Sequence, residues 1–574
     1  MRHRLVAPLG ASLLAAFVLL TPDARAQSAD PTFGDETAGP DEIAGEIAVD
    51  LRDDASDADI ADLDAHEGIT LRPSSVWSTT HDRLEIADVD PAREASILDD
   101  LSRDSRVEHA EPMAIYRATF VPDDPLYASK QWHLARVGAE SAWEYTCGQG
   151  ITVAVIDTGV ACFDKGPFSR GTDLSGTRCE GGWNFVNDDA EAADDHGHGT
   201  HVAGTIAQTT NNGMGTAGLA YCATLMPIKV LSKQGFGSTA NVAEGIRFAA
   251  DNGAQIINMS LGGPIKSKIL EDAVNHAIAR GVVVVAAAGN SGRSVGWPAA
   301  YPGVVAVSAT DDKDKIAWFS SRGPEVAIAA PGVAVTQQTI CNGGQNKCEI
   351  FGTFNGTSMA SPHVAGIAAM IEGMGVTDGA AVRDVLTSTA RPKDEPKLYG
   401  AGIVDAGAAA RRVFWRDLTL RTVALLGLFA LVASRIRKRG GTVVRNVASV
   451  GGAIIAGIGL LPFAPVLGFG RFASLAMRPL GEWDLVLLGA GVHKWLLLAS
   501  ALPALALTMV AFTSRRVRPL IGGIALGSAA LLAQHLVSGD VAYVGGPMLA
   551  KVWLAANGLL CLWLARMALD AKRG

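Results

Sequence analysis

The spacing of apolar residues divides this 574-residue chain into regions that predict different structures. Between residues 121 and 412, short runs such as Ile151–Ile156 and Gly281–Val285 are separated by segments rich in glycine and other small residues. Unbroken β-branched runs of this length are typical of strands buried on both faces of a parallel sheet. The middle region is therefore predicted to be an α/β domain.

The preceding region, residues 27–120, is strongly acidic and alternates between strand and helix patterns. Residues 28–118 contain 24 Asp and Glu against seven Arg and no Lys. Up to about Pro40 the composition is typical of a disordered segment. Beyond it we predict a small α+β domain, with strands at Glu46–Val49 and Arg83–Ala87, helices at Asp57–His66 and Pro91–Ser102, and an extended segment at Val107–Tyr116.

After Arg412 the apolar stretches become long, and several could span a bilayer. They lie near residues 419–434, 446–469, 495–512, 519–538 and 545–567. Basic clusters at Arg435–Arg439, Arg515–Arg518 and Lys572–Arg573 predict, by the positive-inside rule, about five transmembrane helices in a domain at 413–574. The preceding domains would lie outside and the C-terminus in the cytoplasm. A buried apolar soluble domain is the alternative, and the stretches contain no acidic pair or metal-ligand cluster.

The first 26 residues have the pattern of a secretory signal peptide. Arg2 and Arg4 precede an apolar run to Leu20, and Ala24-Arg25-Ala26 forms a small-residue cleavage site. We therefore expect cleavage after Ala26 and export of the domains that follow.

Three polar motifs in the middle region adjoin predicted buried segments. Asp157 follows the run Ile151–Ile156, and a carboxylate at the tip of a buried strand must be paired. A histidine-rich loop at 195–204 enters a small-residue helix, and Ser358 precedes the apolar run Val364–Met370. A serine there is either an ordinary helix N-cap or a nucleophile placed where the helix dipole favours negative charge.

The order Asp, His, Ser is one of the chain orders in which catalytic triads occur. With the strings Asp157-Thr-Gly, His198-Gly-Thr-His-Val-Ala-Gly and Asn355-Gly-Thr-Ser-Met-Ala-Ser-Pro-His, the chain resembles the subtilisin-like serine proteases (subtilases), nearest to the thermitase branch, over roughly residues 122 to 410. The resemblance implies a parallel sheet with helices on both faces.

The resemblance also implies the roles of the catalytic residues. Ser358 would be the nucleophile and His198 the general base, with Asp157 orienting the imidazole. Asn290, which follows the strand pattern at 281–285, would donate its side-chain N–H to the oxyanion beside the Ser358 N–H. His201 is expected to be structural, and His196 is given no role.

Substrate-binding segments are implied more loosely. Ser260, Leu261 and Gly262 belong to a segment that pairs with the substrate backbone as an added strand, which predicts broad specificity. Gly296 lies in the segment that floors the P1 pocket and would leave it open and uncharged. We therefore expect a preference for large apolar P1 residues.

The same resemblance implies a structural Ca²⁺ site built from oxygen ligands, which Ca²⁺ prefers. Its ligands would be the side chains of Asp124, Asp173 and Asn212 and the carbonyl groups of Thr210, Met214 and Thr216. The alternative is a solvated Asn-Gly turn with two surface aspartates. No catalytic cofactor is implied.

Six of the seven cysteines lie in the middle region, which predicts disulfides in an exported domain. Fifteen connectivities are possible. The favoured pairs are Cys341–Cys348 across a short loop, Cys162–Cys179 around the insertion after Asp157, and Cys147–Cys222, whose following strands are neighbours in the subtilase sheet. Cys561 is expected to be a buried free thiol.

Together these patterns predict a membrane-tethered, extracytoplasmic serine endopeptidase made as a zymogen. Residues 27–120 resemble an inhibitor prodomain, whose tail around Pro112 to Val121 would occupy the active cleft and be cut autocatalytically; an acidic spacer is the alternative. Expected partners are protein or peptide substrates, the prodomain and the lipid bilayer, with no nucleic acid. Alternative functions are a dedicated maturation protease, the processing arm of a membrane transporter or partner-binding module, and a non-catalytic binding module.

Overall fold

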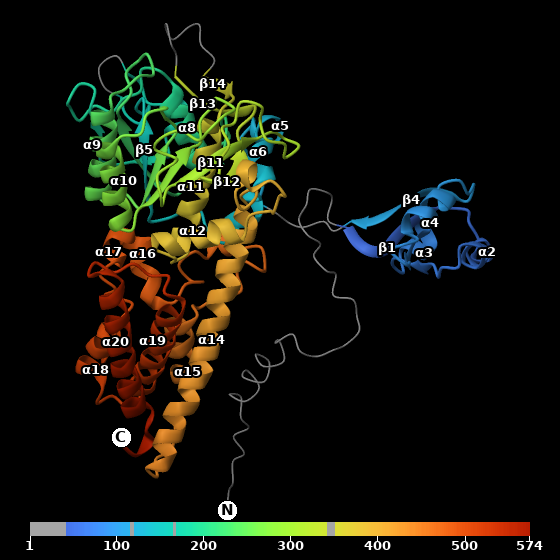
Figure 1. Cartoon of the computed structure of the whole chain (residues 1–574). Helices are drawn as coiled ribbons and strands as arrows, with labels where there is room; N and C mark the ends of the chain where they lie inside the picture. The colour runs from blue at the N-terminus through green and yellow to red at the C-terminus, as the bar shows by residue number, and fades with distance from the viewer. Residues whose placement is uncertain (1–41, 115–119, 165–167, 341–349, 574) are drawn as a thin grey trace, which may run out of the picture. The chain divides into compact units, whose positions relative to one another are not determined.

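The computed structural model describes residues 42–114, 120–164, 168–340 and 350–573 (Figure 1). The chain forms two compact units, Met1–Ala118 and Thr119–Gly574, and each is described by itself. The predicted signal peptide, half of the predicted prodomain tail (residues 115–119), and Cys341 and Cys348 lie outside the described residues.

The first unit is a small antiparallel α+β domain, as its strand–helix alternation predicts. Its sheet has the strand order β2-β3-β1-β4. The elements are β1 Glu42–Leu51, α2 Asp57–Glu67, β2 Arg72–Pro73, α3 Ser78–His81, β3 Leu84–Asp88, α4 Glu94–Leu101 and β4 Val107–Ala114. The helix predicted from Pro91 begins at Glu94 instead, because a turn closed by the Asp90 carbonyl precedes it.

The second unit is built around a parallel sheet with the path β12-β11-β10-β9-β5-β8-β6, and β7 pairs with β8. Its strands are β5 Thr152–Asp157, β6 Arg178–Cys179, β7 Trp183–Asn184, β8 Thr224–Lys229, β9 Ile256–Met259, β10 Val283–Ala287, β11 Val305–Thr310 and β12 Val326–Pro331. A separate antiparallel pair is formed by β13 Val335–Gln338 and β14 Phe351–Phe354.

Helices cover both faces of this sheet, as predicted. They are α5 Tyr127–Lys130, α6 Trp132–Arg136, α7 Ala139–Trp143, α8 His198–Ala207, α9 Thr239–Asp251, α10 Lys268–Ala279, α11 Thr357–Gly373, α12 Gly379–Ser388 and α13 Pro396–Tyr399, with a 3₁₀ turn at Thr172–Leu174. Val153 and Val155 of β5 share a core with α8 and α11, whereas Ala154 and Ile156 share a second core with α9 and α10. Alternate residues of one strand thus supply two cores.

The C-terminal part of the second unit is a bundle of apolar helices. They are α14 Ala406–Lys438, α15 Val447–Gly457, α16 Trp483–Leu488, α17 Ala490–His493, α18 Leu502–Ala511, α19 Arg518–Ser538 and α20 Gly546–Leu569, with 3₁₀ turns at Gly470–Phe472, Leu480–Glu482 and Ala571–Arg573. Within the described residues, three helices are long and apolar enough to cross a membrane: α14, α19 and α20. The apolar stretches at 446–469 and 495–512 form only the short helices α15 and α18.

Local features of the sequence explain why α15 and α18 are short. After α15 the chain turns at Gly459, whose φ is +92°, and Pro462 and Pro465 prevent the helix from resuming. Before α18, Leu496 has a φ of +49°, and Pro503 occupies the first turn of the helix, where proline is tolerated. Of the five apolar stretches, three therefore form helices that are each long enough to cross a bilayer within the described residues.

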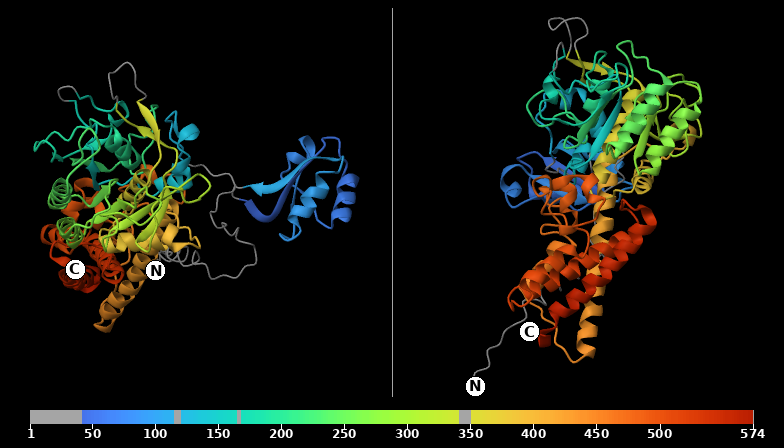
Figure 2. Two further views of the ribbon diagram at one scale, coloured as in Figure 1. Left: turned by 45° about the horizontal axis from the view of Figure 1, so that its top comes forward. Right: turned by 90° about the vertical axis from the view of Figure 1, so that its left-hand side faces the viewer.

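Helix α14 begins inside the sheet domain and continues without a break into the bundle (Figure 2). Its first turns place Ala406, Ala409, Ala410 and Val413 in the core shared with α8 and α11. The predicted boundary at residue 412 thus falls within a continuous helix of 33 residues. The bundle is attached to the sheet domain by regular secondary structure.

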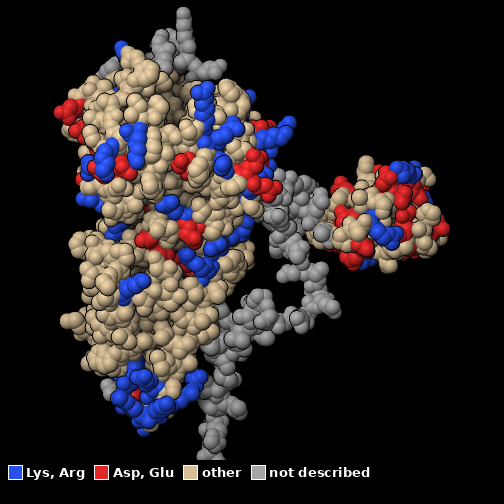
Figure 3. Space-filling model, viewed as in Figure 1, with Lys and Arg blue, Asp and Glu red and all other residues tan. Residues whose placement is uncertain are grey.

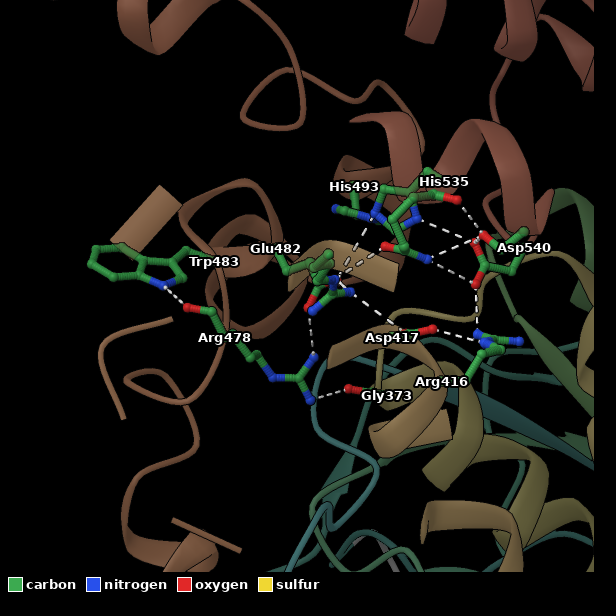
Figure 4. Close-up of polar contacts among 12 residues, drawn as sticks. Gly373, Arg416, Asp417, Arg478, Glu482, Trp483, His493, His535 and Asp540 are labelled. Atoms are coloured by element: carbon green, nitrogen blue, oxygen red, sulfur yellow. Dashed lines mark hydrogen bonds and ion pairs between the residues drawn. The ribbon is translucent and has the colours of Figure 1, made fainter. Parts of the chain in front are cut away.

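A buried ionic network also joins the bundle to the end of α11 (Figure 4). Arg478 donates a hydrogen bond to the carbonyl oxygen of Gly373, the last residue of α11, and its guanidinium lies 3.8 Å from the Glu482 carboxylate. Glu482 in turn pairs with Arg421 of α14. These three charged side chains are buried, so the contacts link α14 to α11 through the interior.

The network continues along the first turns of α14. Arg416 lies 2.6 Å from Asp540 and 2.8 Å from Asp417, and the His535 imidazole lies 3.1 Å from Asp540. The Asp540 carbonyl accepts hydrogen bonds from the N–H groups of Thr377 and Asp378, between α11 and α12. The carboxylates of Asp417, Glu482 and Asp540 thus come from distant parts of the sequence, and each lies outside the apolar stretches, which contain no acidic pair.

Candidate active site

The predicted catalytic residues gather at the edge of the sheet where its parallel strands end. Asp157 is the last residue of β5, Ser260 follows β9, and Asn290 follows β10. Carboxyl ends of adjacent parallel strands lie at one edge, which is where ligands bind in open α/β sheets. Helices α8 and α11 begin at this edge with His198 and Ser358 in their first turns.

Asp157 and His198 form a directed hydrogen-bonded pair. His198 Nδ1 lies 2.7 Å from Asp157 Oδ1, and the same oxygen accepts the Thr158 N–H at 2.7 Å. Asp157 is fully buried. Burial disfavours the charged imidazole, but the charge of Asp157 and its hydrogen bond outweigh burial and raise the pKa of His198 above its ordinary value. With Nδ1 held by the carboxylate, Nε2 is left to exchange a proton with another group.

Asp194, which the sequence analysis did not single out, fixes the start of α8. Its Oδ1 accepts hydrogen bonds from the N–H groups of His196 and Gly197 and from the Thr158 hydroxyl, at 2.8–3.0 Å. Its Oδ2 accepts from the N–H and hydroxyl groups of Thr200 at 2.9 and 2.6 Å. The sequence signal was an aspartate just before a helix start, where a carboxylate satisfies free N–H groups.

Ser358 is seated by two reciprocal contacts with Ser260. The Ser358 hydroxyl donates to the Ser260 carbonyl at 3.0 Å, and the Ser260 hydroxyl donates to the Ser358 carbonyl at 2.7 Å. Ser260 also contacts the Ser361 hydroxyl at 2.9 Å and accepts from the Asn258 amide at 3.0 Å. The end of β9 therefore positions the first turn of α11.

The Asn290 side chain has a defined orientation. Its Oδ1 accepts hydrogen bonds from both the N–H and the hydroxyl of Thr357, each at 2.9 Å. This assigns the oxygen to the side facing α11 and leaves Nδ2 as a donor near the turn at Gly356. A side-chain N–H fixed beside the start of a helix suits a site where negative charge develops.

The predicted substrate-binding segments lie side by side. Gly263 and Trp297 exchange two backbone hydrogen bonds of 2.8 and 2.9 Å, so the segment after Ser260, Leu261 and Gly262 runs next to the segment containing Gly296. A Cβ added at Gly296 would lie 3.2 Å from the Gly263 carbonyl oxygen. The glycine thus allows a close approach of the two segments.

The predicted calcium ligands also come together. The loop containing Thr210, Asn212, Met214 and Thr216 packs against the carboxylates of Asp124 and Asp173. Burial raises the pKa of Asp173 to about 6, against hydrogen bonds from Thr216 and Asn212 that lower it, and burial also raises the pKa of Asp124. Asp124 Oδ1 is buried without a hydrogen-bond partner.

The chemistry of this donor set fits a hard cation only in part. No group of three His, Cys, Asp or Glu side chains that could hold a metal ion occurs in the described ranges. A cation here would depend on two carboxylates completed by amide and carbonyl oxygens. The Asn212 amide donates its N–H to Asp173 at 2.9 Å, so its side chain would have to turn to offer oxygen.

Three other histidines of the sheet domain, His201, His133 and His363, are fully buried. His201 lies against the Val335 and Gly352 carbonyls and stacks on Phe354, and burial lowers its pKa to about 3. This geometry fits a structural residue. His133 and His363 form a buried pair with 2.7 Å between Nδ1 and Nε2.

Two of the predicted disulfides are present, Cys147–Cys222 and Cys162–Cys179. The second closes the segment that follows Asp157, and the first joins the approaches to β5 and β8. Cys561 is a buried free cysteine in α20, as expected.

Comparisons with known proteins match the sheet domain. The chain is 39% identical over 286 residues to thermitase of Thermoactinomyces vulgaris, which covers 49% of this chain and 94% of thermitase. The chain belongs to the subtilase family. The subtilase family model matches residues 148–402. Subtilisin Savinase of Lederbergia lenta is 42% identical over 286 residues, with 49% of this chain and 99% of Savinase covered.

A solved protease structure resembles the sheet domain, and a second family model matches part of the helical bundle. A protease of Pseudoalteromonas arctica PAMC 21717 shares 33% identity with this subtilase over 51% of this chain and all of that chain, with a TM-score of 0.47. Residues 474–573 match a domain of unknown function, DUF5942, which includes helices α16 to α20. This subtilase therefore combines a serine peptidase domain with a helical region whose family has no assigned role.

Proposed function

We propose that this subtilase is a membrane-tethered, extracytoplasmic serine endopeptidase made as a zymogen. The observation that carries the peptidase proposal is the Asp157–His198 pair, 2.7 Å apart, at the sheet edge that also holds Ser358 and Asn290. Each of these side chains is oriented by contacts independent of a substrate.

In the proposed reaction Ser358 attacks the carbonyl carbon of the scissile peptide bond. The Ser358 hydroxyl first turns from the Ser260 carbonyl toward His198. The new Oγ–C bond forms as the serine proton passes to His198 Nε2, and Asp157 stabilises the imidazolium. The negative charge on the former carbonyl oxygen is met by the Asn290 side chain and the Ser358 N–H.

Collapse of this intermediate breaks the C–N bond, and His198 gives its proton to the leaving amine. Water then attacks the acyl-enzyme, its proton passing to the same imidazole, and Ser358 is regenerated. The Ser260–Gly263 segment would hold the substrate backbone, and the Gly296 segment would receive an apolar P1 side chain.

The peptidase proposal is tested by Ser358→Ala in the full chain. Peptide cleavage and removal of residues 27–120 should both be lost, whereas Ser175→Ala at an exposed position should retain both. Maturation of purified Ser358→Ala would show that processing is not autocatalytic. Peptide cleavage by that variant would contradict the assigned nucleophile.

The membrane proposal is supported by the surface of α14. Apart from Arg416, whose side chain is 28% exposed, the residues of α14 that reach the surface between Arg412 and Arg435 carry no charge. The 22 intervening residues span about 33 Å of helix, the thickness of a bilayer core. The exposed Trp415 lies near one end of this segment and Arg435, Arg437 and Lys438 at the other. Figure 3 shows basic residues at the end of the bundle remote from the sheet domain, beyond a band with few charges.

This basic end would face the cytoplasm, and the peptidase domain would lie on the opposite, extracytoplasmic side of the membrane. Retention in membranes after alkaline extraction, with a C-terminal tag protected from externally added protease, would support both points. Release by alkaline extraction would contradict insertion, and digestion of the tag would contradict the orientation.

The zymogen proposal is supported by the separate core of the first unit. Ile47, Val49, Leu63 and Leu101 are buried within it. An inhibitor prodomain requires such a core, whereas an acidic spacer does not. Mass spectrometry of the active protein and of Ser358→Ala should give different N-termini. The same N-terminus in both would contradict self-processing.

The calcium proposal is supported by the close approach of Asp124 and Asp173 beneath one loop and by the unpartnered Asp124 Oδ1. A bound cation would neutralise these carboxylates and stabilise the folded state by mass action. Chelation should lower the midpoint of thermal inactivation, and Asp173→Asn should reduce that effect. An unchanged midpoint on chelation would contradict the site.

The breadth of the substrate set separates a dedicated maturation protease from a general endopeptidase. Proteins of the membrane and exported fractions can be compared between cells with active Ser358 and cells with Ser358→Ala. A single accumulating precursor would favour dedicated maturation, and many would favour broad specificity.

A further inference from the structure

The catalytic centre and the C-terminal bundle lie at opposite ends of the same two elements. Helix α11 holds Ser358 as its second residue and contacts Arg478 of the bundle through Gly373, its last residue. Strand β5 ends in Asp157, and Gly150, just before the strand, accepts a 2.9 Å hydrogen bond from the Ala490 N–H of the bundle. Helix α11 and strand β5 therefore both run from the catalytic centre to the C-terminal bundle.

The two elements give the same separation. Gly373 lies 15 positions after Ser358, and at 1.5 Å per residue an α-helix covers about 22 Å over that length. Asp157 lies seven positions after Gly150, and an extended chain at 3.3 Å per residue covers about 23 Å over that length. The catalytic residues thus lie about 22 Å from the surface that contacts the bundle.

This separation is fixed by the way the two regions are joined. Helix α14 passes from the core of the peptidase domain into the bundle as one continuous element. The buried contacts of Arg478 with Gly373, and of Thr377 with Asp540, hold the other side of the junction. A domain joined in this way is not free to tilt on a linker toward the membrane.

The level of the junction relative to the bilayer follows from α14. Its uncharged exposed segment begins after Arg412, so the hydrocarbon core would begin close to Trp415. Arg416, next to Trp415 on this helix, pairs with Asp540, and the Asp540 carbonyl accepts the N–H of Thr377, four residues after the end of α11. The end of α11 therefore meets the bundle near the outer membrane boundary.

We propose that the peptidase domain is held at a fixed height, so that its substrates are peptide segments about 20 Å or more from the bilayer surface. Soluble proteins and the distal parts of membrane-anchored proteins meet this condition, and bonds next to a transmembrane segment do not. The inference rests on the proposed function, because it requires both peptidase activity and membrane insertion.

The required length of chain can be calculated. An extended segment covers about 20 Å with six residues, whereas a flexible Gly-Ser segment reaches that root-mean-square distance with about 11 to 16 residues. Cleavage should therefore rise steeply as a cleavable sequence is moved from three to 15 residues away from a membrane anchor.

The experiment uses the full-length enzyme reconstituted in phospholipid vesicles with single-span reporter substrates. One cleavable sequence is placed 3, 6, 10, 15 or 25 Gly-Ser residues from the span, on the side of the peptidase domain. A soluble peptide with the same sequence is the activity control, and Ser358→Ala is the matched inactive enzyme. Cleavage of the three-residue reporter should be at least 10-fold slower than cleavage of the 25-residue reporter.

The outcomes separate this inference from the proposed function. If all reporters are cleaved at one rate, the fixed-height inference is wrong while the peptidase assignment stands. If even the soluble peptide resists cleavage, the proposed function fails and the inference with it. A rise in rate between 6 and 15 residues, absent with Ser358→Ala, supports both.

Discussion

Arg478 donates a hydrogen bond to the carbonyl oxygen of Gly373, the last residue of the helix whose second residue is Ser358. The C-terminal carbonyls of a helix have no partner within the helix, and a buried end needs one. A guanidinium also complements the negative end of the helix dipole. The helical bundle thus completes an element of the peptidase domain.

Arg478→Ala should therefore weaken the peptidase domain although the residue is remote from the proposed active site. The substitution leaves the Gly373 carbonyl buried with one donor fewer and removes a partner of Glu482, which typically costs about 3–5 kcal/mol. The midpoint of thermal inactivation and the fraction of enzyme labelled by a serine-reactive probe should both fall. Arg437→Ala, at an exposed position, is the control, and equal behaviour of the two variants would refute the role.

Asp194→Asn should alter both stability and the pH dependence of hydrolysis. An amide offers one acceptor oxygen where the carboxylate now accepts five hydrogen bonds, so buried donors would lose partners at about 1–3 kcal/mol each. Asp194 also contributes to the raised pKa of His198.

In the proposed mechanism His198 must be neutral to accept the serine proton. Activity should therefore fall as the pH is lowered through a pKa above the ordinary imidazole value. In Asp194→Asn this acidic limb of the kcat/KM profile should move to lower pH, because a negative charge that favours the imidazolium has been removed. A limb at the same pH in both enzymes would contradict this electrostatic contribution.

Gly296→Ala should narrow the choice of P1 residue. The added Cβ would lie 3.2 Å from the Gly263 carbonyl oxygen, which is tighter than ordinary contact and would crowd the space between the two segments. KM should rise several-fold for substrates with a large apolar P1 residue and change little for those with alanine there. An equal change for both substrates would place the P1 pocket elsewhere.

Acid should destabilise the peptidase domain through its buried histidines. Burial lowers the pKa of His363 to about 4 and places the pKa of His133 well below its ordinary value. Between these values and about 6.5 the unfolded chain binds more protons than the folded chain, so stability falls as pH falls through this window. His133→Gln, which keeps a donor for His363, should make the thermal midpoint less dependent on pH between 7 and 4.5. An equal pH dependence of the thermal midpoint in His133→Gln and in the unsubstituted protein would contradict this contribution.

Local patterns in the sequence were sufficient to predict the sheet domain. The β-branched run ending at Asp157 and the apolar run after Ser358 form β5 and α11, because strands and helices buried on all sides leave an unmistakable apolar signal. The pairing Cys147–Cys222 followed from the neighbouring strands of the subtilase sheet, and Cys162–Cys179 from the insertion that these cysteines bracket.

The contacts that depend on distant segments were not predictable in this way. Asp194 is one aspartate among several in an acidic loop, and only the folded chain shows five donors around its carboxylate. Arg421, Glu482 and Asp540 stand far apart in sequence, and the fold alone brings them into one network. The continuity of α14 was likewise not predictable. The amino-acid composition changes near residue 412, which suggests a domain boundary, but the helix continues through this position.

If the bundle is inserted in a membrane as proposed, the continuity of α14 also affects the lifetime of the enzyme. Proteases cut exposed, extended segments, and an ordered helix packed into two cores offers none. Where a peptidase on a flexible stalk could be shed by a single cut, this one would first have to unfold the start of α14, whose residues belong to the core of its own peptidase domain. Release from the membrane and loss of activity would then be the same event, and no soluble, active form would escape its site.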